Sequence, residues 1–228
     1  TWRGWERGIT HIDMLSPRIQ SLQGTQLAWN PSTSKKGVTA EAILLPLVSN
    51  PEEFQSWLPN VKGKLVMISP LEATGRPDYN WEEFATEASF NKMKVAREIA
   101  SIAWRENMKN TGFTSRSIIE ALENAGAAGI VSSYWSKGFG VSKIFSARTK
   151  KIPTVDLELE DYSMVYRLAA RGEKPVLNIV AQSKDLGLIP LLKLKELRNQ
   201  RNMSYYLLTL ILGMVVQGQR ITGQVPLL

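Results

Sequence analysis

SIIEALENAGAAGIVSS, residues 117–133, predicts a short helix that leads directly into a buried strand. Three apolar residues recur at helical spacing: Ile118, Ile119 and Leu122. Asn124-Ala125-Gly126 supplies a helix stop, and Gly129-Ile130-Val131 begins a β-branched run. The small residues between them allow the helix to lie close against a sheet. We therefore expect the remaining strands to be arranged around this helix–strand unit.

Composition describes a globular chain that is large enough to bury its own core. Of the 228 residues, 43% are hydrophobic and 21% are charged, which is ordinary for a folded domain. The absence of cysteine excludes disulfides, cysteine-rich zinc sites and thiol nucleophiles. The net charge is +7, but most basic residues alternate with acidic ones, so we expect no nucleic-acid partner.

One segment, Lys137–Lys151, is basic without an acidic residue beside it in the sequence. Its cations are Lys137, Lys143, Arg148, Lys150 and Lys151. Such a run is more often a solvated loop face, and the alternative is a patch for an acidic ligand or an adjoining domain.

Hydrophobic patterning predicts further strands and helices on both sides of the central unit. The expected strands are 38–48, 64–68, 152–157 and 176–181, and Pro46 in the first of them suits a sheet edge or a strand end. The expected helices are 51–58, 80–110 and 159–170, with Gly172 as a stop. In the long helix, Asn80 and Glu83 resemble a capping box, and an apolar stripe consists of Phe84, Ala88, Val95, Ile99 and Ile102. Residues 28–34 read as a turn-rich linker with a buried Trp29.

Residues that often carry chemistry do not form an active site in this sequence. Four hydroxyl residues, Ser132, Ser133, Ser136 and Thr154, have no histidine partner, so a hydrolase triad is not supported. His11 is the only histidine, and with only Asp13 nearby we interpret it as structural. The carboxylates Glu158, Glu160 and Asp161 can bind a cation, but at a helix start they are more often solvated or capping residues. Trp2 and Trp5, beside Arg3 and Arg7, either stack on a ligand or pack on a neighbour missing from the chain.

Four segments in a fixed order resemble the protease-associated domain. They are VKGKLVMI, the helix that ends in ENAGAAGIVSS, KIPTVDLELEDYSMV and the closing VLNIVAQSKDLG. The resemblance covers roughly Gly37 to Asp185. Three further segments look like those of a longer type of protease-associated domain, found within co-catalytic zinc metallopeptidases similar to plasma glutamate carboxypeptidase and zinc aminopeptidases. They are the insertion 71–114, the leader AWNPS and the exit SKDLG.

This resemblance implies a fold, a domain organisation and a role. It implies an α/β (α+β) protein with a β-sandwich or barrel-like protease-associated core, flanking helices and an inserted long helix. Residues 1–36 are then a leader of the parent peptidase, 37–187 the protease-associated domain with the helical insertion 71–114, and 188–228 an aberrant apolar segment that replaces the start of the catalytic domain. The role implied is a non-catalytic portion of an exported, extracellular or periplasmic hydrolase, which shapes or covers a substrate cleft. Its partners are then a peptide substrate or the peptidase catalytic domain.

In the parent family, two zinc ions would be held by residues that follow the protease-associated domain, and this chain shows no such ligands there. After Pro190 the chain has no histidine, and Glu196 is its only acidic residue. Codons permitted for residues 190–226, read one nucleotide earlier, can spell a segment with the family's His-x-Asp and Asp-Asn ligands. We therefore hypothesise that the chain is a fragment whose end is a frameshifted translation of the metal site.

The alternatives treat the C-terminal segment as genuine. Its apolar run, Tyr205–Val216, is shorter than the about 20 residues of a membrane-spanning helix, so a poorly specified helix is favoured over a membrane anchor. The chain is then a standalone protein- or peptide-binding module, or a tail-anchored membrane protein. Whether it is an enzyme stays open at this stage.

Overall fold

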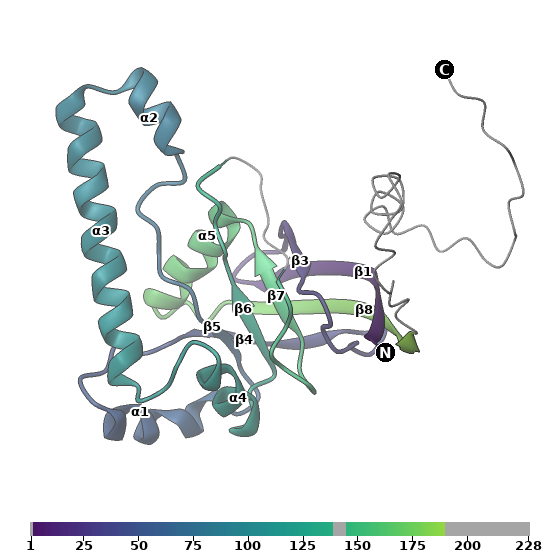
Figure 1. The fold of residues 1–228 in the computed structure, drawn as a ribbon. Helices are drawn as coiled ribbons and strands as arrows, with labels where there is room; N and C mark the ends of the chain where they lie inside the picture. The colour runs from purple at the N-terminus through teal and green to yellow at the C-terminus, as the bar shows by residue number, and fades with distance from the viewer. Residues whose placement is uncertain (1, 139–144, 190–228) are drawn as a thin grey trace, which may run out of the picture. The chain divides into compact units, whose positions relative to one another are not determined.

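The computed structural model describes residues 2–138 and 145–189, which form one eight-stranded mixed sheet with five α-helices (Figure 1). The strands are β1 (Trp2–Ser16), β2 (Gln20–Ser21), β3 (Gly24–Gln26), β4 (Val38–Leu44), β5 (Leu65–Met67), β6 (Gly129–Ser132), β7 (Thr154–Leu157) and β8 (Val176–Ile189). The helices are α1 (Pro51–Trp57), α2 (Asp78–Phe84), α3 (Glu87–Asn110), α4 (Ser117–Asn124) and α5 (Leu159–Ala170), with a 3-10 turn η1 (Leu58–Val61) after α1. The fold is thus mixed α/β, as the sequence predicts.

Parallel strands form the middle of the sheet and antiparallel strands form its margins. The order is β2-β1-β8-β4-β5-β6-β7-β3, with parallel pairing from β4 through β7. Strand β8 is antiparallel to β1 and β4, and β3 is antiparallel to β7. The far end of the order curls back towards β1, since in β3 the Gln26 N–H donates to Thr10 Oγ1 at 3.3 Å and the Gln26 side chain donates to the Ile9 carbonyl at 3.4 Å. The sheet is therefore curved into the barrel-like form that the sequence led us to expect.

The central helix–strand unit is confirmed in detail. Helix α4 ends at Asn124, and Gly126 has a φ of 92°, a left-handed conformation that favours glycine at a helix end. At Gly129, a Cβ atom would lie 2.8 Å from Leu65 Cδ2 and 3.1 Å from the Pro153 carbonyl oxygen. The turn after α4 and the start of β6 therefore depend on glycine for two different physical reasons.

The core has two parts, one on each face of the parallel strands. Along β5, Leu65 and Met67 pack towards α5, β1 and β8, while Val66 packs towards α1 and α4. Strands buried on both faces read as continuous apolar runs, which explains the KLVMI sequence. Figure 1 shows α5 and the α1–α4 pair on opposite sides of these strands.

The long helix predicted for residues 80–110 is two helices, so its predicted N-terminus and capping box are wrong. Helix α2 ends at Phe84, and Thr86 caps α3, with its Oγ1 accepting from the Ser89 N–H at 3.3 Å. Asn80 lies inside α2, where its side chain accepts from Arg76. A side-chain cap at Thr86 and an extended Ala85 favour a new helix start there over continuation.

The predicted apolar stripe of this region does not face the core. Val95 and Ile99 on α3 are 59% and 63% exposed, and Phe84 on α2 is 67% exposed. Helix α3 packs on the core near its C-terminal end, through Trp104 and Met108, and Met93 is a buried apolar side chain earlier in the helix. Figure 1 shows α2 and α3 as an arm beside the sheet, with α2 at the end away from α1. We call residues 78–110 the helical arm.

Two further expectations need correction. Pro46 follows the end of β4, which confirms one of the two positions expected for it. The other expectation, a sheet edge, is wrong, because β4 lies between β8 and β5. Trp29 is 40% exposed rather than buried, and it lies in the turn after β3 with a positive φ of 56°.

The first and last strands extend further than their sequence patterns suggest. Strands β1 to β3, which the sequence assigns to the leader 1–36, share one sheet with the strands of residues 37–187. The frameshift and membrane-anchor predictions concern residues 190–228, which lie outside the described residues. Among the helices of the described part, none has the length and apolar character to cross a membrane.

Candidate functional site

Three of the four hydroxyl residues considered as nucleophiles form hydrogen bonds within or beside the sheet. Ser132 is buried, and its Oγ donates to the Val155 carbonyl at 3.1 Å. The Ser133 N–H donates to Ser69 Oγ at 2.9 Å. Thr154 is buried at the start of β7, with its Oγ1 2.8 Å from Thr149 Oγ1. Ser136, the fourth candidate, is partly buried after β6.

The carboxylates near β7 also have structural partners. Asp161 Oδ2 accepts from the Gln23 N–H at 2.6 Å, and the Glu158 N–H donates to the Gln23 carbonyl at 2.9 Å. Glu160 and Asp161 lie in the first turn of α5, where negative charge stabilises a helix. Helix α5 has no side-chain cap hydrogen bond, so these contacts favour a structural role, rather than capping or a cation site.

The described residues do not fit a pair of zinc ions. His11, the only histidine in the chain, lies on β1 with its Nε2 2.9 Å from Asp13 Oδ2. Across residues 2–138 and 145–189, no group of three or more His, Cys, Asp or Glu side chains is placed to hold a metal ion.

The basic segment has an acidic partner that its own sequence does not reveal. The Glu123 carboxylate accepts the backbone N–H groups of Lys150, Lys151 and Ile152, at 2.9, 2.7 and 3.2 Å for its Oε1. This carboxylate at the end of α4 fixes the backbone before β7, and the lysine side chains are exposed. Of the remaining cations in the segment, Lys143 lies outside the described residues.

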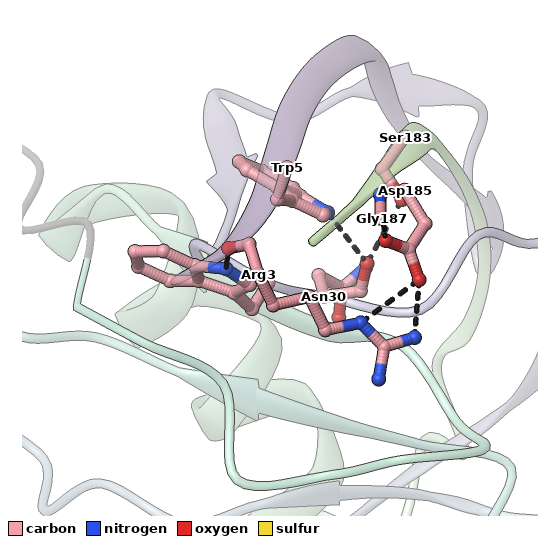
Figure 2. A network of polar contacts seen from close by, with 7 residues as sticks. Arg3, Trp5, Asn30, Ser183, Asp185 and Gly187 are labelled. Carbon is pink, nitrogen blue, oxygen red and sulfur yellow. Dashed lines mark hydrogen bonds and ion pairs between the residues drawn. The ribbon is translucent and has the colours of Figure 1, made fainter. Parts of the chain in front are cut away.

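A hollow of about 420 Å³ lies where β1, β8 and the turn after β3 meet, and we call it the β1–β8 hollow. Its lining comes from segments far apart in the sequence: Arg3, Gly4, Trp5, Trp29, Asn30, Pro31, Ser32, Thr149, Lys150, Ser183 and Asp185. Figure 2 shows the polar contacts that hold these segments together. It is one of two hollows with a mixed aromatic and cationic lining that we consider as binding sites.

Asn30 is the residue that joins the walls of this hollow. Its buried side chain accepts from the Thr154 N–H at 2.6 Å and donates to the Pro31 carbonyl at 3.0 Å. Its backbone carbonyl accepts from Trp5 Nε1 at 3.2 Å and from Ser183 Oγ at 2.9 Å. One residue therefore connects β1, β7 and β8.

Trp5 packs within the chain rather than on a missing neighbour, which corrects that expectation. Its ring stacks on Trp29 with centroids 6.3 Å apart, and the Arg7 guanidinium lies 5.4 Å from its centroid. The Trp29 Nε1 donates to the Arg3 carbonyl at 3.2 Å. The two indoles thus form one wall of the hollow.

An exposed ion pair forms the rim. Arg3 Nε donates to Asp185 Oδ2 at 2.9 Å, and Figure 2 shows the guanidinium directed at that carboxylate. The hydrogen bond from Arg3, together with one from the Gly187 N–H, lowers the pKa of Asp185, and the same pair raises the pKa of Arg3. Both groups are solvent-exposed, so this pair sets local geometry more than stability.

Sequence reasoning missed Asn30 as a structural centre. The only signal was its place in the Ala28–Ser34 turn, where Asn-Pro marks a loop without revealing which distant strands it joins.

Comparison with known proteins gives a consistent set of relatives. The chain is similar to carboxypeptidase Q of Bos taurus (26% identity over 180 residues), of Mus musculus (24% over 180) and of Homo sapiens (25% over 183). Each match covers 79% of this chain and 32% of the relative, so the chain spans about a third of the length of these proteins. No protein-family model matches the chain.

Two solved peptidase structures align with most of the chain at TM-scores below 0.5. A peptidase M28 precursor from Shewanella amazonensis SB2B aligns with a TM-score of 0.49 at 18% identity, covering 82% of this chain and 37% of that one. An aminopeptidase from Aneurinibacillus sp. strain AM-1 aligns with a TM-score of 0.47 at 9% identity, covering 81% and 33%. From the sequence matches we conclude that the chain is related to carboxypeptidase Q over a partial region, consistent with the protease-associated portion of such a peptidase.

Proposed function

We propose that this chain supplies the non-catalytic, protease-associated portion of an exported zinc peptidase of the aminopeptidase or carboxypeptidase kind. The observation that carries the proposal is the similarity to carboxypeptidase Q over 180 residues, which covers only 32% of that protein. In this proposal the chain shapes or covers the substrate cleft, and the metal ligands belong to a different portion of the peptidase. Its partners are a peptide substrate and a peptidase catalytic domain, and its location is extracellular or periplasmic.

The pairing of the first and last strands supports this role. Trp2 pairs with Ile189 in the β1–β8 ladder, so a polypeptide that continues in both directions leaves the sheet at one end of this strand pair. A domain joined to its neighbour at one such point can move as a unit over a cleft. Near this end, Leu188 is 74% exposed, which leaves apolar surface available for an adjoining domain.

Hydrolysis by the chain itself tests the proposal. The 228-residue chain, with and without zinc, is incubated with a panel of short peptides that have free termini, and human carboxypeptidase Q serves as the positive control. We expect no zinc-dependent hydrolysis by the chain, because its described residues lack a metal-holding cluster. Zinc-dependent turnover that is lost with a chelator and restored by zinc would refute the non-catalytic role.

A standalone peptide-binding module is the second candidate function. The observation in its favour is that the β1–β8 hollow combines two indole rings with the cations of Arg3 and Lys150. Tight peptide binding by the chain, with no affinity for a peptidase catalytic domain, would favour this alternative.

A further inference from the structure

A second hollow, of about 400 Å³, lies between the start of α4, the end of β6 and the segment that precedes β7. We call it the arginine hollow. Its lining consists of Leu27, Thr114, Ser115, Arg116, Ile119, Tyr134, Phe145, Ser146, Arg148 and Thr154. Its volume falls in the range of about 300–1,000 Å³ that is typical of small-molecule sites.

The charged side chains that line the arginine hollow are both cationic. Arg116 and Arg148 both line it and are both exposed, and its lining contains no aspartate or glutamate. Within the described ranges, neither guanidinium takes part in an ion pair or a hydrogen bond, whereas Arg3 and Arg97 both pair with aspartates. Two unneutralised guanidinium groups at one hollow favour an anion, and their planar donors match the two oxygens of a carboxylate.

The inner surface of the hollow is apolar and aromatic. Ile119 and Leu27 are buried at 4% and 2% exposure, so the floor belongs to the protein core. Tyr134 and Phe145 form an edge-to-face pair with ring centroids 5.8 Å apart. Burial raises the pKa of Tyr134, so its hydroxyl stays protonated at neutral pH and adds no negative charge. An anion with an apolar group attached fits this lining better than a bare inorganic ion.

The backbone around the hollow is held in place by hydrogen bonds. The Ala28 N–H donates to the Phe145 carbonyl at 2.9 Å, and the Ala147 N–H donates to the Ala28 carbonyl at 2.7 Å. On the other wall, the Thr114 Oγ1 accepts from the Ser117 N–H at 3.1 Å at the start of α4. The segments that carry Arg116 and Arg148 are therefore positioned before any ligand arrives, which lowers the entropic cost of binding.

We propose that the arginine hollow binds the free α-carboxylate of a peptide that ends in an apolar residue. Arg116 and Arg148 hold the carboxylate, and the terminal side chain contacts Phe145, Tyr134 and Ile119. The choice of a peptide as the carrier of the carboxylate rests on the proposed function, whereas the preference for an apolar carboxylate follows from the lining alone.

Calorimetric titration of the metal-free 228-residue chain tests this site. The probe is N-acetyl-Ala-Ala-Leu with a free carboxylate, and its C-terminal amide is the matched comparison. We expect the acid to bind at least about tenfold more tightly than the amide, because a charge-assisted pair to arginine is lost in the amide. Arg116→Gln and Arg148→Gln should each weaken binding of the acid by about tenfold or more, with little change for the amide.

Two control variants distinguish binding from general effects. Arg171→Gln removes one exposed positive charge at the end of α5 and should leave the affinity within about twofold. Phe145→Ala should reduce the preference for a terminal leucine over a terminal glycine while the acid still binds better than the amide. Circular dichroism verifies that each variant keeps the fold.

Three results would overturn the proposal. They are equal binding of acid and amide, affinity unchanged by both arginine variants, and inorganic phosphate binding as tightly as the peptide acid. The titration contains no metal and measures no hydrolysis. Its failure would therefore refute the carboxylate site without refuting the proposed accessory role in a peptidase. Conversely, hydrolysis by the chain alone would refute the non-catalytic role without affecting this site.

Discussion

Asn30 Oδ1 accepts the backbone N–H of Thr154 at 2.6 Å, joining two buried residues that are 124 positions apart in the chain. The same asparagine contacts Trp5 on β1 and Ser183 on β8 through its carbonyl oxygen. The turn after β3 thereby links the first and last strands to β7.

Replacing Asn30 with alanine should destabilise the fold by about 1–3 kcal/mol, because the Thr154 N–H is left buried without an acceptor. Urea denaturation followed by circular dichroism measures the change. Asn60→Ala, at an exposed position in the turn after α1, is the matched control and should change stability by less than about 0.5 kcal/mol. Equal effects of the two substitutions would show that Asn30 has no special role.

The core and the helical arm should respond differently to truncation of apolar residues. Leu122→Ala removes a side chain with no exposed surface in α4 and should cost about 2–5 kcal/mol. Ile99→Ala, on the exposed stripe of α3, should change stability by less than about 0.5 kcal/mol. A loss above 2 kcal/mol for Ile99→Ala in thermal unfolding would mean that the stripe is covered in the folded chain.

The partly buried carboxyl of Glu72 should make the stability of the fold depend on pH. Burial raises the pKa of its carboxyl, and the nearby cations Arg97 and Lys137 offset part of that effect. Since the folded-state pKa lies above the unfolded value of about 4.3, Glu72 favours the folded state below that pH. This contribution is lost as the pH rises through the folded-state pKa.

Glu72→Gln should therefore raise the Tm at pH 7 relative to the unmodified chain and leave it nearly unchanged at about pH 3. Thermal unfolding across this pH range measures the difference. The exposed Glu82 on α2 provides the control, because Glu82→Gln should give no comparable pH-dependent gain. A lower Tm for Glu72→Gln at pH 7 would contradict the burial argument.

Glu123 should control the order of the segment before β7. Glu123→Ala removes the acceptor of the Lys150, Lys151 and Ile152 N–H groups, so hydrogen exchange at these amides should accelerate at least about tenfold. Amides in β6 and β8 should keep their protection. Unchanged exchange at the three amides would mean that other contacts hold the segment.

Local sequence patterns predicted the elements whose signals are short-range. The apolar spacing of α4, its glycine stop and the β-branched run of β6 agree with the structure because one stretch contains all three signals. The β5 strand was predictable for a related reason, since burial on both faces leaves a continuous apolar run.

One error was local: the arm divides at Thr86 because a cap there competes with the longer helical pattern. The other errors arose where distant contacts decide the outcome, as for the exposed stripe of α3, whose Trp104 and Met108 pack on the core from the C-terminal end of the helix. The length of β1 and β8 depends on their mutual pairing, and the Arg3–Asp185 pair joins residues 182 positions apart. No local pattern carries such information, so the two hollows could not be predicted from the sequence.

The most direct test of the central claim is the zinc-dependent kcat/KM of a chimera. The segment of human carboxypeptidase Q that matches this chain is replaced with residues 2–189, and a variant in which a short Gly-Ser linker replaces that segment is the reference. Our account predicts that the chimera hydrolyses peptide substrates faster than the linker variant, because the inserted residues restore the cover of the cleft. A chimera that is folded and binds zinc, yet is no more active than the linker variant, would contradict that account.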